Sequence, residues 1–272
     1  MSREEEYKSL IDLMLCLIQA QVGPVSEGHV WANDSHILAI KLFRHLVSMQ
    51  CLKSGATVSG PLGIFPCVDH SSIKVVARAA FETYLVFFYI FGNGITEESR
   101  FRHLTWKLGG LTDRQKSFAS TEESKEILAQ EKALIEKIKE EIAPHAEFIA
   151  LTAEQKKEIL KGNWRRGQPW WTLGVTAGFH EIYFKNIYGY LCGYSHSSYI
   201  SVLQVEQANS PQDQDMLAEA IMGVGLVVMG HFAYSYSALF QGAQEVLEVH
   251  SAKDVASKWQ FGAEDMAKIY ER

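Results

Sequence analysis

Apolar residues recur along this chain at helical spacing, and no segment alternates between apolar and polar residues as a half-buried strand would. Leu10 and Met14 lie four residues apart in a first segment, and Leu38, Leu42 and Leu46 recur every four residues in a second. Such spacing places the apolar side chains on one face of a helix. The pattern predicts an all-α protein, a single multi-helix bundle domain.

Helix start signals divide this pattern into elements. Ser2 with Glu5 forms a capping box, and Ser210, Pro211 and Asp213 supply a cap, a proline in the first turn and an early acid. The helix that Ser210 opens is predicted to run to about Val249. Gly and Pro residues interrupt the segment from Gly55 to Cys67, which is therefore predicted to be an ordered loop.

The segment 71–91 is predicted to be a helix that is apolar on nearly every side, yet it contains Arg78 and Glu82. Residues four apart on a helix face the same way. Buried charges cost several kcal/mol each unless they are paired and hydrogen-bonded, so these two are expected to have partners elsewhere in the fold. One interpretation is a buried structural ion pair. The other is an anion site, in which Arg78 binds a phosphate that Lys74, one turn earlier, shares.

Residues 120–162 are highly charged, with a narrow apolar seam. Ser120 and Glu123 form a second capping-box pattern, and Pro144 ends the helix that they open. A second charged helix over 152–161 is expected to fold back on the first. The predicted structure is a charged helical hairpin that protrudes from the bundle, with a coiled-coil-like seam.

A loop with three tryptophans and a further helix follow. In the segment 162–174, Arg165 and Arg166 stand among the tryptophans, where they are able to stack on and clamp a nucleotide, although packing explains the tryptophans equally well. The helix is predicted to run from about Val175 into the sequence YGYLCGYSHSS, whose end contains Ser195 and His196. A titratable imidazole beside hydroxyl groups is suited to general acid–base chemistry. A histidine that merely caps the helix is the structural alternative.

The segment 220–244 contains no Asp, Glu, Lys or Arg, and an uncharged run of about 18 residues or more is long enough to cross a membrane. Acidic residues flank it on both sides, and it contains His231, Gln241 and several glycines. A central core helix is therefore the preferred interpretation, with membrane association as the alternative.

Composition narrows the class of protein. The 272 residues are 47% hydrophobic and 21% charged, as in ordinary globular proteins, and the net charge of −6 gives no overall attraction for nucleic acid. The four cysteines show no zinc or disulfide spacing, and the acidic start lacks the features of a signal peptide. We therefore expect a cytoplasmic protein.

Common catalytic motifs are absent from the sequence. It has no P-loop, no GxGxxG after a strand, no GxSxG, no HExxH and no Glu-x-x-His pair of the kind that di-iron bundles use. No cofactor and no metal are expected.

Two segments together resemble a known type of domain. DHSSIKVVARAAFE, from Asp69 to Glu82, and the later IYGYLCGYSHSS are similar to an uncharacterised bacterial all-helical family, a domain of unknown function, and remotely to the HEPN group of RNA- and nucleotide-related domains. The resemblance nominates Arg78, Glu82, Ser195 and His196, with Tyr188. HEPN ribonucleases have Arg and His four to six residues apart on one helix, whereas the residue six before His196 here is a tyrosine.

Three functions remain open from the sequence. The first is a helical module that binds another protein or pairs with itself, in bacterial stress or phage defence, with Arg78–Glu82 as a structural pair. The second is an enzyme on a phosphate-bearing substrate, RNA or a nucleotide, in which Arg78, Glu82 and His196 are catalytic and Lys74, Tyr188, Ser195, Arg165 and Arg166 bind. The third is membrane association through 220–244.

Overall fold

A computed structural model describes residues 1–21, 28–61 and 63–270, and it is helical throughout except for one small two-stranded sheet. The predicted all-α fold is therefore confirmed. The chain forms two compact units: unit 1 contains residues 1–88 and 174–272, and unit 2 contains residues 89–173. Unit 2 thus extends beyond both ends of the hairpin predicted at 120–162.

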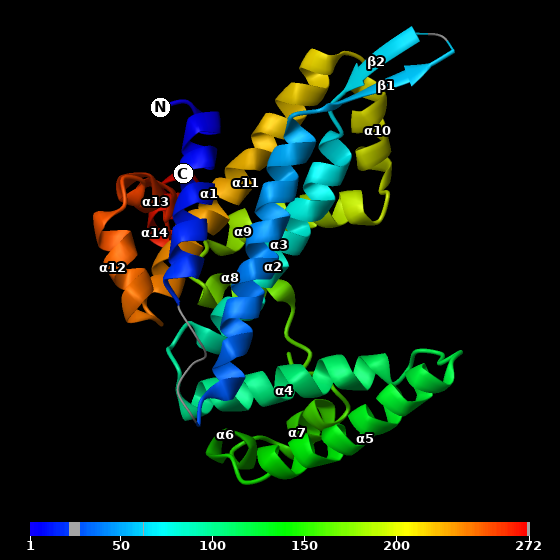
Figure 1. The fold of residues 1–272 in the computed structure, drawn as a ribbon, viewed down its shortest axis with the longest axis vertical. Helices are drawn as coiled ribbons and strands as arrows, with labels where there is room; N and C mark the ends of the chain where they lie inside the picture. The colour runs from blue at the N-terminus through cyan, green and yellow to red at the C-terminus, as the bar shows by residue number, and fades with distance from the viewer. Residues whose placement is uncertain (22–27, 62, 271–272) are drawn as a thin grey trace. The chain divides into compact units, whose positions relative to one another are not determined.

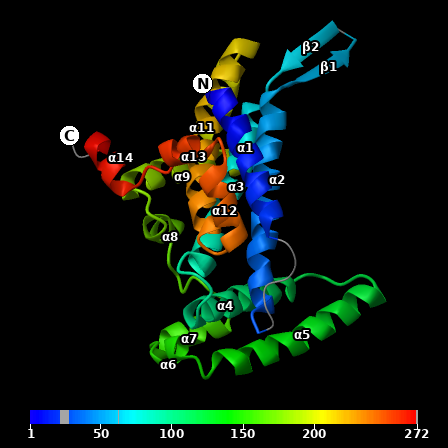
Figure 2. The ribbon, with the colours of Figure 1, turned by 60° about the vertical axis from the view of Figure 1, so that its left-hand side comes forward.

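Unit 1 is built on long helices from both ends of the chain. Its elements are α1 (Arg3–Ala20), the short 3-10 helix η1 (Val30–Ala32), α2 (Asn33–Lys53), β1 (Ala56–Gly60), β2 (Gly63–Cys67), most of α3 (His70–Phe91), the end of α8 (Trp170–Thr176), α9 (Glu181–Ser195), α10 (Tyr199–Gln207), α11 (Pro211–Ser237), α12 (Gln241–Val249), α13 (Lys253–Trp259) and α14 (Ala263–Tyr270). Figures 1 and 2 show α1, α2 and α11 side by side.

Helix α11 lies in the core of unit 1, in contact with α1, α2, α12 and α13. Among the described residues it is the one helix that is long and apolar enough to cross a membrane, and 72% of its most apolar stretch is buried within the protein. Leu226, Met229 and Phe232 are fully covered by neighbouring side chains. This burial is typical of a core helix.

Capping explains where several helices begin. The Ser2–Glu5 and Ser210–Asp213 capping boxes are both present, as predicted. The box predicted at Ser120 and Glu123 is wrong. The next hydroxyl residue, Thr121, caps α5 instead and accepts a hydrogen bond from the backbone N–H of Ser124.

Strands β1 and β2 form an antiparallel hairpin where a loop was predicted, with Ala56 opposite Cys67 and Val58 opposite Phe65. The prediction of an ordered loop from Gly55 to Cys67 is therefore wrong. The hairpin is exposed on both faces, so it lacks the alternation that marks a half-buried strand. Gly55 has φ of +76°, and a Cβ there would lie 3.0 Å from the carbonyl oxygen of Cys67, so this turn into the hairpin requires glycine.

Two predicted helices are interrupted in the structure. The helix predicted from Val175 onward is broken before α9, where Gly178 has φ of +92°. The helix predicted to run from Pro211 to Val249 ends at Ser237, and α12 starts at Gln241. There a Cβ on Gly242 would lie 2.8 Å from the carbonyl oxygen of Ala20, so close packing on α1 accompanies the break.

Unit 2 has an apolar core of its own. Its helices are α4 (Glu97–Arg114), α5 (Glu122–Ile142), α6 (Ala146–Ile149) and α7 (Ala153–Leu160), with the last residues of α3 and the first of α8. Helices α4 and α5 lie side by side (Figure 1), so the seam residues of α5, including Ile135, Ile138 and Ile142, pack with Leu104 and Leu108. Charged α5 thus packs on α4, and α4 also contacts α6 and α7, the later part of the predicted hairpin.

Candidate functional site

Arg78 and Glu82 form an ion pair on α3. The Nε of Arg78 donates to Oε1 of Glu82 over 2.9 Å, as their spacing predicts. The side chains of Arg78 and Glu82 are 22% and 26% exposed. The pair is therefore half-buried, whereas the structural interpretation expected a buried pair. Burial alone would lower the pKa of Arg78, but Glu82 and then Tyr188 raise it overall. Arg78 is therefore a permanent cation with a partly open surface.

The partners of this pair come from α9. The hydroxyl group of Tyr188 donates to Oε1 of Glu82 over 2.6 Å, and the guanidinium carbon of Arg78 lies 5.6 Å from the centre of the Tyr188 ring. The ring stacks on that of Phe184, with the centroids 5.4 Å apart. Burial, and then Glu82, raises the pKa of Tyr188, so this hydroxyl group keeps its proton. Tyr188, which the resemblance nominated as a binding residue, thus lies against the Arg78–Glu82 pair.

His196 reaches Arg78 from the end of α9. It is the residue that follows the last turn of the helix, its side chain is exposed, and its Nε2 lies 3.4 Å from Nη1 of Arg78. Ser197, the next residue, has φ of +50°, a left-handed conformation that turns the chain toward α10. The structure thus brings His196 to Arg78, and so to the Arg78–Glu82 pair that the sequence nominated from another segment.

Lys74 points into the interior of unit 1. Its side chain is 1% exposed, and Nζ lies 2.9 Å from the hydroxyl oxygen of Tyr194 and 3.0 Å from Nδ1 of His70. No described contact joins it to Arg78. Lys74 and Arg78 are therefore not seen to share an anion site in this structure.

A second polar cluster surrounds Lys74. The hydroxyl groups of Tyr194 and Tyr190 both donate to Oε1 of Gln204 on α10, the latter over 2.9 Å. Tyr190, Tyr194 and Gln204 were not predicted as site residues from the sequence. The four-residue spacing of the two tyrosines on α9 was the available signal, since it places both on one helix face.

The other nominated residues make local contacts. The hydroxyl group of Ser195 donates to the carbonyl oxygen of Leu191 over 3.3 Å, within α9. Arg165 and Arg166 belong to unit 2. Arg165 lies 4.7 Å from the Trp170 ring centre and donates to the carbonyl oxygen of Gln168 over 2.8 Å, so its described contacts are those of a packed loop.

Asp12, Cys16 and His250 offer ligand atoms within 4.8 Å of one another. Nδ1 of His250 accepts a hydrogen bond from the backbone N–H of Ala252, so the proton of the neutral ring is on Nε2, which faces Asp12 at 3.4 Å. A metal would need the lone pair of that same nitrogen. Burial, and then Asp12, also raises the pKa of the Cys16 thiol. The 3.4 Å approach of the imidazole to the Asp12 carboxylate accounts for the closeness of these two groups.

The site around Arg78 is thus chemically simple. It combines a fixed cation, an exposed imidazole and a tyrosine hydroxyl that holds the carboxylate in place. Such a set is able to bind an anion and to move one proton.

No protein-family model, curated protein or solved structure matches the chain. The resemblance to HEPN domains stays a prediction.

Proposed function

We propose that Arg78 binds a phosphate group of an RNA or a nucleotide, and that His196 acts as a general acid or base on that substrate. The observation that supports this proposal is the 3.4 Å approach of His196 Nε2 to Arg78 Nη1. Guanidinium groups suit phosphate oxygens because their planar donors match the spacing of those oxygens. A neighbouring imidazole supplies the proton transfer that a phosphate reaction needs.

The hydrogen-bond roles at this contact assign the proton. Arg78 is only a donor, so in a direct contact Nε2 of His196 accepts and Nδ1 carries the ring proton. An incoming phosphate oxygen would take over as the acceptor for Arg78. Nε2 would then be available to take a proton from an attacking hydroxyl group or water.

Glu82 and Tyr188 act in this proposal as positioning residues. Glu82 holds the Nε edge of the guanidinium, and Tyr188 donates to the same carboxylate oxygen. Arg78 therefore keeps one orientation before the ligand arrives, which reduces the entropy lost on binding.

The test is calorimetric titration of the full chain with inorganic phosphate and with 5′-AMP, together with a cleavage assay on a single-stranded RNA. R78Q should weaken phosphate and AMP binding by about tenfold or more, since a hydrogen bond between charged groups contributes about 1.5–3 kcal/mol. H196A should keep most of the affinity and lose turnover. The exposed residues Arg44 and His29 supply the matched controls R44Q and H29A. Binding that is equal in R78Q and R44Q would overturn the proposal.

Self-association is a second candidate function, and the exposed face of α10 favours it. Tyr199, Ile200, Val202 and Val205 are 77%, 54%, 55% and 52% exposed. The helix carries no charge from Tyr199 to Val205, so the same faces of two copies meet without like-charge repulsion. We propose that a second copy of the chain covers this face.

Light scattering after size exclusion, over a range of concentrations, tests this second function. The native chain should show the mass of a dimer, and V202E should shift it to the monomer. Val249, 86% exposed at the end of α12, supplies the control V249E, which should stay dimeric. A native chain that stays monomeric at every concentration would rule out self-association.

A further inference from the structure

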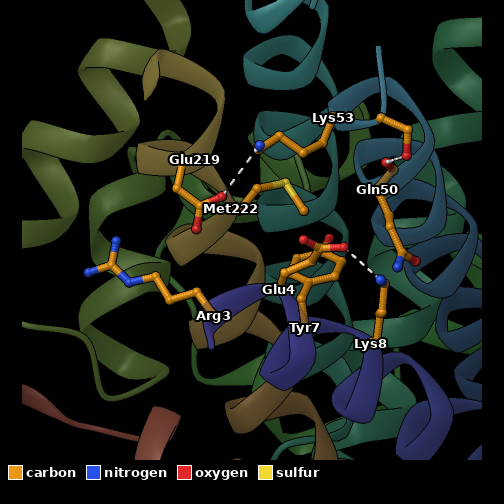
Figure 3. Close-up of a pocket in the computed structure, with 9 residues that line it drawn as sticks. Arg3, Glu4, Tyr7, Lys8, Gln50, Lys53, Glu219 and Met222 are labelled. Carbon is orange, nitrogen blue, oxygen red and sulfur yellow. Dashed lines mark hydrogen bonds and ion pairs between the residues drawn. The ribbon is translucent and has the colours of Figure 1, made fainter. Parts of the chain in front are cut away.

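A hollow of about 180 Å³ lies between the start of α1, the end of α2 and the middle of α11. Its apolar part is formed by Tyr7 and Met222, which are 2% and 5% exposed (Figure 3). Charged side chains, among them Arg3 and Glu219, line the rest together with Gln50 and Ser54. The hollow is smaller than the pockets of about 300–1,000 Å³ that hold drug-sized ligands, so it suits a small metabolite.

A second, more open hollow of about 650 Å³ adjoins the first along α11. Arg3 and Glu219 line both hollows. These two residues therefore belong to the boundary that the two hollows share.

The charges around the hollow differ in how well they are paired. Lys8 and Glu4 form an ion pair of 2.6 Å, and Lys53 pairs closely with Asp215. Within the part of the chain that the structure describes, the one ion pair of Glu219 is longer, 3.6 Å from its Oε2 to Nζ of Lys53 (Figure 3).

Arg3, an exposed residue, differs from the other cations of the hollow in having no ion pair among the described residues. In residues 1–21, 28–61 and 63–270 it takes part in no ion pair, whereas Lys8 and Lys53 both do. The two residues that line both hollows are thus a cation without an ion pair and an anion with only a long one. A ligand that carries one charge of each sign would satisfy both.

We propose that this hollow binds a free α-amino acid with an apolar side chain. Its carboxylate would accept hydrogen bonds from Arg3, its ammonium group would donate to Glu219, and its side chain would cover Tyr7 and Met222. This site is separate from the one around Arg78, and the inference does not rest on the proposed phosphate chemistry.

Calorimetric titration of the full chain with L-leucine, L-methionine and L-valine tests the site. At least one of them should bind, and N-acetylation or amidation of that amino acid should weaken its binding by about tenfold or more, because each change removes one charge. R3Q and E219Q should weaken it similarly. R44Q and E206Q, which change exposed residues outside the hollow, should leave the affinity unchanged, as should R78Q.

Three results would overturn the proposal. The first is that none of the three amino acids binds at about 10 mM. The second is that the charge-blocked forms bind as well as the parent amino acid. The third is that R3Q and E219Q retain the native affinity. Thermal unfolding followed by circular dichroism confirms first that both variants are folded. R78Q tests phosphate binding, whereas R3Q and E219Q test amino-acid binding. The two proposals are therefore tested independently.

Discussion

Nζ of Lys74 donates a hydrogen bond to the hydroxyl oxygen of Tyr194 over 2.9 Å, inside a part of unit 1 where Lys74 is almost completely buried. Its other close neighbours are also uncharged groups: Nδ1 of His70 at 3.0 Å and the rings of Tyr194 and Tyr190 at 4.1 and 5.4 Å. No carboxylate in the described part of the chain forms an ion pair with it. Burial lowers the pKa of Lys74 from 10.5 to about 8.

The first prediction follows from this lowered pKa. Between pH 8 and pH 10.5 Lys74 is largely neutral in the folded chain and charged in the unfolded chain, so the unfolded chain binds more protons. The free energy of unfolding should therefore rise with pH, by up to about 1.4 kcal/mol per pH unit from this residue. K74M should lack that contribution. Urea unfolding of both proteins at pH 8 and pH 9.5 measures the difference.

A matched control separates Lys74 from lysines in general. Lys41 is exposed on α2, so K41M should keep the native slope. If the free energy of unfolding of K74M and of the native chain rises equally between pH 8 and pH 9.5, burial does not lower the pKa of Lys74 in the folded chain.

The second prediction concerns the hydroxyl group of Tyr188. Y188F keeps the ring that stacks on Phe184 and removes the 2.6 Å hydrogen bond to Glu82. The free energy of unfolding should fall by about 1–2 kcal/mol, since the lost bond has a charged acceptor that keeps its bond to Arg78. Tyr199 is 77% exposed, so Y199F should change stability by less than about 0.5 kcal/mol. Equal effects of the two changes in urea unfolding would argue against the Tyr188–Glu82 bond.

The third prediction concerns acid stability. Glu6 is 5% exposed and accepts from Lys258 Nζ over 2.5 Å and from Trp259 Nε1 over 2.9 Å. Burial alone would raise the pKa of Glu6, but these two hydrogen bonds lower it overall from 4.5. A carboxyl group with a lowered pKa stabilises the fold above its unfolded pKa, and this contribution is lost as the pH falls through the folded value.

E6Q should therefore destabilise the chain by about 1–3 kcal/mol at pH 7. The gap between E6Q and the native protein should narrow below pH 4.5, where the native carboxylate is progressively protonated. Urea unfolding at pH 7 and pH 3.5 measures both values, with the exposed Glu126 as the site of the control E126Q. A gap that is the same at both pH values would contradict a charged role for Glu6.

Capping-box patterns in the sequence correctly predicted where two of the helices begin. Ser2 and Ser210 cap their helices because a hydroxyl group and an acid three residues later satisfy the free backbone N–H groups of the first turn. At Ser120 the same pattern failed because the adjacent Thr121 offers an equivalent hydroxyl group. The β1–β2 hairpin was missed because neither face of it is buried, so no alternation marks it.

For the site around Arg78, the sequence predicted contacts within one helix but not those that depend on packing between helices. Arg78 and Glu82 pair within one helix, and their spacing alone places them together. The contact between His196 and Arg78 depends on how α9 packs against α3. The sequence nominated both residues but did not show that they meet. The inward direction of Lys74 depends on the same packing. The spacing of four residues from Arg78 suggested only, in one of two interpretations, that Lys74 shares an anion with Arg78.

The last prediction tests the packing of α11 with two glycines of that helix. A Cβ on Gly230 would lie 2.8 Å from the backbone carbonyl carbon of Trp259 and 2.9 Å from the carbonyl oxygen of Ala256, whereas a Cβ on Gly223 would meet nothing within 4 Å. G230A must therefore push α13 away and should cost about 1–3 kcal/mol. G223A should instead stabilise the protein by about 0.5–1 kcal/mol, because alanine loses less backbone entropy in a helix. Thermal and urea unfolding measure both variants, and changes of the same sign would show that α13 does not lie against α11 at Gly230.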